Sequence, residues 1–140
     1  MAAPGTEATI RTWFQRVWTD RDATAIDEMF VPERHGVVGL AKAAIGPKEF
    51  RSFWDMMTAA LRDTRVVIEQ LWVANEESVF FARMLATSVR GGKSIDVRFS
   101  GHAVVKEGKI VEATNVVDFL ALMQQLGALE ADALVAALAV

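Results

Sequence analysis

The sequence predicts a single α+β domain in which helices come first and an antiparallel sheet follows. Up to Arg62, apolar residues recur every three or four positions, as in helices with one buried face. From Arg65 to Val117 they alternate with polar residues, as in strands. The strands are joined by short turns, so we expect an antiparallel meander. Helices then pack on one face of a curved sheet.

Three helices are expected before the sheet. The first covers Glu7–Thr19, with Thr6 as its cap and a buried face of Ile10, Trp13, Phe14, Val17 and Trp18. Asp22 caps a short second helix that Pro32 ends, and a short strand follows around His35–Leu40. Gly46-Pro47 begins the third helix, because proline at an early helical position loses no hydrogen bond.

The strands and the C-terminal region follow. The predicted strands are Arg65–Ala74, Ser78–Arg90, Ser94–Lys106 and Lys109–Val117. A helix begins near Asp118, breaks at Gly127 and resumes from Glu130. Within the single domain 1–140, we expect residues 1–6 to be a flexible N-terminus and residues 128–140 a helical extension.

The last hairpin sets which side chains share a face of the sheet. We prefer a three-residue loop, Lys106-Glu107-Gly108, because a two-residue loop would place Glu107 in the left-handed region. Val105 then pairs with Lys109, and one face collects polar side chains: Asp96, Arg98, Ser100, His102, Glu112, Thr114 and Asp118. This face is either solvated, as in many antiparallel sheets, or curled so that Asp118 faces a cavity beneath the helices.

Composition excludes several classes of protein and site. The net charge of −3 leaves no basic patch for nucleic acid, and the absence of cysteine excludes disulfides and thiolate metal sites. No apolar run reaches the roughly 20 residues of a membrane helix, and the N-terminus lacks the pattern of a signal peptide. We therefore expect a cytoplasmic protein that binds no membrane.

Several segments, in order, resemble the SnoaL-like polyketide cyclases of the nuclear-transport-factor-2-like superfamily. They are GPKEF (residues 46–50), VFFARMLAT (79–87), GKIVE (108–112), VVD (116–118) and QLG (125–127), within Ile10–Leu129. The resemblance implies a conical α+β barrel with a deep apolar pocket, in a homodimer or homotetramer. It implies acid/base chemistry without a metal or an organic cofactor.

The resemblance assigns the acid/base to Asp118, which follows GKIVE, and a partner role to His102 on the preceding strand. A shift of one residue would put Gly101 at the inward position instead of His102. Asp118 also precedes the apolar run Phe119–Met123, where desolvation would raise its pKa. The alternative for Asp118 is a helix N-cap, in which backbone N–H groups would lower its pKa.

Other residues are candidates for contact with a substrate. His35 lies in the segment where family members carry pocket residues, and Arg83 is either an anion-orienting group or a partner in a structural salt bridge. Asn115 could polarise a substrate oxygen. An apolar wall would include some of the large residues of the helices, with Trp13, Phe14, Trp54 and Met57 as candidates.

Two functions fit these features. The first is a cofactor-independent cyclase, isomerase or lyase that acts on an apolar, carbonyl-bearing small molecule. The second is a non-catalytic ligand-binding or dimerisation module of the same fold, because a fold by itself does not fix a function. In the second case the apolar tail ALEADALVAALAV would dock on a neighbouring subunit.

Overall fold

The computed structural model describes residues 3–38 and 46–139, with only the backbone described for residues 32–38. Its first helices are α1 (Thr6–Phe14), a π-helix η1 (Gln15–Thr19), α2 (Thr24–Met29) and α3 (Pro47–Ala60). They match the predicted helices, except that Phe30 already belongs to the first strand. Gly5, not Thr6, is the N-cap of α1, and the Thr6 hydroxyl donates to the carbonyl of Asn75.

The π-helical turn η1 continues α1 and holds Trp18 in the core. A π-turn widens the helix, and such turns are frequent at functional sites. Two side chains from other elements bind its carbonyl groups: Trp54 Nε1 donates to Val17 O at 2.8 Å, and Thr64 Oγ1 donates to Trp18 O at 2.5 Å. These bonds fix η1 against α3 and the sheet.

The sheet has five strands in the order β1-β5-β4-β3-β2. Strands β2 (Leu61–Ala74), β3 (Glu77–Ser88), β4 (Ser94–Lys106) and β5 (Lys109–Val117) form the predicted antiparallel meander. Strand β1 (Phe30–Val38) adds to β5 in parallel, a pairing that the sequence did not predict. The predicted Gly39 and Leu40 lie outside the described residues.

The β4–β5 hairpin corrects the predicted loop and register. Lys106 pairs with Lys109, so the loop has two residues, with φ of 51° at Glu107 and 73° at Gly108. Such a turn matches the right-handed twist of the strands, and this outweighs the cost of a left-handed Glu107. Val105 pairs with Ile110 but Val104 with Glu112, which makes Val111 the extra residue of a β-bulge. Turn and bulge together shift the register by two residues, so the predicted division into faces survives beyond the bulge.

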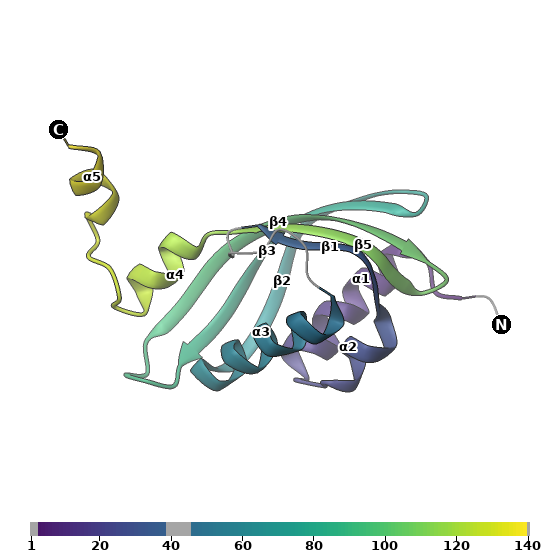
Figure 1. Cartoon of the computed structure of the whole chain (residues 1–140), viewed down its shortest axis with the longest axis horizontal. Helices are drawn as coiled ribbons and strands as arrows, with labels where there is room; N and C mark the ends of the chain where they lie inside the picture. Colours follow the sequence, from purple (N-terminus) through teal and green to yellow (C-terminus); the bar gives the residue numbers. More distant parts are fainter. Residues whose placement is uncertain (1–2, 39–45, 140) are drawn as a thin grey trace.

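The sheet curves over the N-terminal helices. Figure 1 shows α1, α2 and α3 on one side of the sheet, which we call the inner face, and the opposite side is the outer face. Helix α4 (Phe119–Gln125) follows β5, and α5 (Ala133–Leu138) stands away from the sheet and the first three helices (Figure 1). The predicted break at Gly127 separates them, with a positive φ of 82°. This arrangement is the predicted α+β fold, and its core lies between the inner face and the helices.

Candidate functional site: an apolar cavity under the sheet

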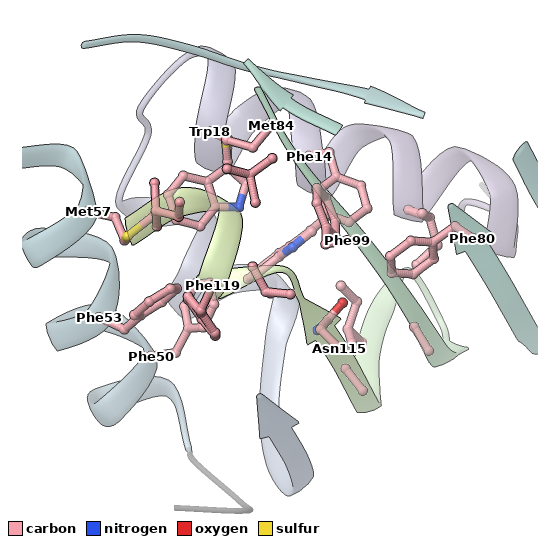
Figure 2. A pocket seen from close by; sticks show the side chains of 18 of the residues that line it. Phe14, Trp18, Phe50, Phe53, Met57, Phe80, Met84, Phe99, Asn115 and Phe119 are labelled. Atoms are coloured by element: carbon pink, nitrogen blue, oxygen red, sulfur yellow. The ribbon is translucent and has the colours of Figure 1, made fainter. Parts of the chain in front are cut away.

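A cavity of about 100 Å³ lies between the inner face and helices α1, α3 and α4. Nine of the described lining residues are aromatic: Trp13, Phe14, Trp18, Phe30, Phe50, Phe53, Phe80, Phe99 and Phe119. Aliphatic side chains complete the wall, among them Met57, Met84, Val97, Ala113 and Val117. Figure 2 shows α3 supplying Phe50, Phe53 and Met57 at one side, with Phe80 and Asn115 at the other.

Alternation along the strands brings these side chains together. In β4 the odd-numbered residues Ile95, Val97, Phe99 and Ala103 line the cavity, and the even-numbered residues between them lie on the outer face. In β5, Ala113, Asn115 and Val117 line it. The helical residues Trp13, Phe14 and Trp18 reach it from α1 and η1, where a period of three to four places them on one side.

Asn115 is the one residue with an amide or charged side chain among the described lining residues. Its carboxamide lies over Gly101, its partner across the β4–β5 pair. A Cβ atom on Gly101 would come within 2.4 Å of Asn115 Oδ1 and 2.5 Å of the Phe80 ring. Within the described part of the chain, this carboxamide has no hydrogen-bond partner. The cavity therefore combines an apolar wall with one free amide.

The structure places the predicted apolar contacts as follows. Trp13, Phe14 and Met57 line the cavity, as does Asn115. Trp54 is buried but turns its indole N–H to Val17 O, so it supports η1 and does not line the cavity.

Asp118 lies outside this cavity. It is exposed and acts as the N-cap of α4, where its Oδ1 accepts a hydrogen bond from the N–H of Ala121 at 2.9 Å. It borders a shallow hollow on the outer face, together with Glu69, Arg98 and Ser100. Of the two alternatives drawn from the sequence, the geometry matches the helix cap. The catalytic role of Asp118 stays a prediction that this position does not favour.

His102 and Arg83 lie on the outer face. Nε2 of His102 is 3.8 Å from a carboxylate oxygen of Glu77, and the imidazole is partly exposed. Gly101 takes the inward position, which was the alternative for this strand. Arg83 forms a bidentate ion pair with Asp96, whose carboxyl pKa this guanidinium lowers. Arg83 thus forms the structural salt bridge that was one of its two predicted roles.

The position of His35 is described only through its backbone. It pairs with Ala113 in the parallel β1–β5 ladder, and Val37 pairs with Asn115. Ala113 and Asn115 both line the cavity, so this part of β1 runs beside the cavity-lining part of β5.

Some residues that line the cavity were not predicted from the sequence to contact a ligand. Phe119 and Leu122 of α4 close one part of the wall, and Trp18 enters through the π-turn. Asn115, by contrast, was among the predicted contacts, and it is the polar residue in the alternating series Ala113, Asn115 and Val117. The position of α4 depends on packing beyond β5 and left no such periodic signal.

Two other kinds of feature were sought among the described residues, a metal site and a membrane-spanning helix. No cluster of three His, Asp or Glu side chains in the described part of the chain is placed to hold a metal ion. Residues 3–38 and 46–139 contain no helix long and apolar enough to cross a bilayer.

Comparison with known proteins fixes the family. The family model described as SnoaL-like polyketide cyclase matches residues 8–126, which is most of the chain. The protein belongs to the SnoaL-like polyketide cyclase family. No curated protein matches the chain at a significant level.

Solved structures share the fold at low identity. A protein from Jannaschia sp. CCS1, assigned as a SnoaL-like polyketide cyclase, superposes with a TM-score of 0.74 at 20% identity, over 89% of this chain and 92% of that one. IdmH from Streptomyces antibioticus, assigned as a polyketide cyclase, gives 0.76 at 16% identity, over 87% and 98%. A protein from Rhodopseudomonas palustris, assigned as an isomerase, gives 0.74 at 14% identity, over 90% and 98%. At these identities the likeness shows the nuclear-transport-factor-2-like fold alone.

Proposed function

We propose that the protein binds an apolar, carbonyl-bearing small molecule in the cavity and holds its oxygen on the Asn115 carboxamide. The observation that carries this proposal is the Asn115 carboxamide, which has no hydrogen-bond partner among the described residues and lies in a wall whose other described residues are apolar. A ligand carbonyl would accept a hydrogen bond from the N–H of this half-buried amide. Few polar groups in an apolar pocket are typical of small-molecule sites, where they orient the ligand.

The reaction that we propose is a cofactor-independent cyclisation or isomerisation. Both begin when a base removes a proton from carbon next to a carbonyl group, and an amide donor on the carbonyl oxygen stabilises the resulting enolate. A carboxamide cannot be that base. His35 is our candidate, since its backbone pairs with Ala113 beside the cavity and a neutral imidazole accepts protons near pH 7.

The second candidate function is ligand binding without chemistry. The position of Asp118 favours it, because the carboxylate that the family resemblance assigned to catalysis caps α4 and does not line the cavity. The two candidates share the binding step and differ in whether the bound ketone loses a proton.

The binding step is tested with Asn115→Leu. Leucine has a similar volume and no amide, so the fold should keep its stability or gain some. Calorimetry should show cyclohexanone binding weakened about tenfold, as expected for one lost hydrogen bond, while methylcyclohexane binds as to the unsubstituted protein. Equal weakening of both ligands would contradict a role of Asn115 in oxygen recognition. Gln70→Leu, which removes an amide at an exposed position of β2 outside the cavity wall, is the control.

Catalysis is tested by exchange of the ketone's α-protons in D₂O, followed by NMR. If the protein is an enzyme, it should accelerate exchange, and His35→Ala should lower the rate about 100-fold. Asp118→Asn, measured in parallel, tests the residue that the family resemblance assigned as the base. If this variant lowers the exchange rate about 100-fold, Asp118 and not His35 is the base. Binding with no acceleration of exchange would instead support the non-catalytic module.

A further inference from the structure

The volume of the cavity limits what it can hold. It measures about 100 Å³. An engineered apolar cavity of about 150 Å³ binds one benzene ring, and pockets for drug-sized ligands measure roughly 300–1,000 Å³. This cavity is smaller than the benzene-binding cavity and far smaller than pockets for drug-sized ligands. Its free volume therefore fits one ring at most.

The walls around this space are packed rings. Phe14 lies edge-on to Phe80 with ring centres 5.2 Å apart, and 5.6 Å from the Phe99 ring. A second pair of wall residues, Trp13 and Phe50, has ring centres 5.5 Å apart. To widen the cavity between these pairs, rings would have to leave favourable aromatic contacts.

The end of the cavity at Asn115 is also close-packed. The Asn115 carboxamide and the Phe80 ring occupy the space over Gly101, where even a methyl group would clash with both. The side of the amide that faces Gly101 is therefore closed to a ligand oxygen. The bound molecule is thus confined by rings along its length and by Asn115 at one end.

We propose that the ligand is a single six-membered ring with a carbonyl oxygen, and that fused polycycles are excluded from this conformation of the cavity. The ring lies between the aromatic side chains, and its oxygen accepts a hydrogen bond from Asn115. This inference rests on the proposed binding function and adds the size class of the substrate.

A series of ketones of increasing size tests this inference by calorimetry: cyclohexanone, 1-tetralone and anthrone. Burial of more apolar surface would normally strengthen binding along the series. We expect the reverse order, with 1-tetralone at least tenfold weaker than cyclohexanone and anthrone without detectable binding. If 1-tetralone or anthrone binds as tightly as cyclohexanone, the single-ring limit is wrong while the binding function stands. If none of the three binds, the proposed function itself fails.

Variants of α4 test whether the wall sets the limit. Phe119→Ala removes a ring from the wall and should improve 1-tetralone binding at least tenfold. Leu120→Ala changes the neighbouring residue of the same helix, which does not line the cavity, and should leave all affinities unchanged. Circular dichroism reports folding, and Phe53→Ala on α3 replaces Phe119→Ala if that variant unfolds. Enlarged variants that still reject 1-tetralone would overturn the assignment of the size limit to these rings.

Discussion

Gly101 shows how a missing side chain builds the site at the residue scale. Glycine on β4 leaves the space that the Asn115 carboxamide and the Phe80 ring occupy. A strand interior gains little from glycine otherwise, since glycine loses more conformational entropy on folding than other residues. The need for close approach across the β4–β5 pair explains its presence.

Gly101→Ala should therefore weaken ligand binding. The new methyl group would displace Asn115 Oδ1 and the Phe80 ring, at a cost of about 1–3 kcal/mol in stability. We expect at least tenfold weaker cyclohexanone binding by calorimetry, with a lowered urea midpoint. Gly5→Ala, where a Cβ meets no atom within 4 Å, is the control for affinity. Undiminished affinity in Gly101→Ala would show that Asn115 does not bind the ketone.

Asp118 also acts locally, as a helix cap. Asp118→Ala removes the acceptor for the N–H of Ala121 and should cost about 0.5–2 kcal/mol in the free energy of unfolding. Asp118→Asn keeps a capping oxygen and should cost little. Urea denaturation separates the two variants, and equal losses would mean that the cap contributes nothing.

At the element scale, one ion-pair cluster joins α2 to the end of the first helix. Arg16 of η1 binds Asp22 at 2.7 Å and Glu28 at 2.7 Å, while Asp22 also accepts hydrogen bonds from Thr24 at the start of α2. Hydrogen bonds from Thr24 and then from Arg16 lower the pKa of the Asp22 carboxyl. Asp22 was predicted to cap this helix, but the N-cap is Ala23; Asp22 lies one residue earlier, and its Oδ1 accepts a hydrogen bond from the N–H of Thr24.

This cluster gives a pH dependence of stability with a defined sign. Because the folded pKa of Asp22 lies below its ordinary value of about 3.9, its contribution is present above that pH and is lost as pH falls through the folded pKa. The urea midpoint should fall between pH 6 and pH 3, and by less in Asp22→Asn than in the unsubstituted protein. Asp27→Asn, at an exposed position of the same helix, controls for the loss of one negative charge. An identical fall in Asp22→Asn would contradict this account.

At the scale of the whole molecule, two apolar surfaces are left uncovered. The outer face exposes Trp72, Val79, Phe81 and Val116, and helix α5 exposes Leu134, Val135 and Leu138. Exposed apolar groups that gather in this way are typical of interfaces between proteins. We propose that a second copy of the chain covers them, as the family resemblance led us to expect.

A chain that ends at Gly127 tests the contribution of the tail. Helix α5 has no buried residue, so the domain should still fold without it. We expect size-exclusion chromatography with light scattering to show a dimer for the full chain and a monomer for the shortened one. If the shortened chain is still a dimer, the tail is not part of the interface. Phe81→Glu would then test the outer face. Ala136→Ser with Ala137→Ser, in the full chain, is the control for polarity at exposed positions of α5.

The elements themselves were largely predictable from local sequence. Strands β4 and β5 begin and end where alternation and turn residues place them, and Gly46-Pro47 marks the start of α3. The parallel pairing of β1 with β5 was not predictable, because it joins segments separated by the whole meander. The hairpin loop was predicted wrongly, because strand twist favoured the two-residue turn over the local preference of Glu107.

The sequence by itself determined the family, the order of the elements and the division of β4 and β5 into a polar and an apolar face, because periodicity is a local property of the chain. Only the tertiary structure decided which face the helices cover. They bury the apolar face, so Asn115 and Gly101 lie at the cavity, whereas His102 and Asp118 lie on the outer side. Burial of apolar area between distant elements drives that choice.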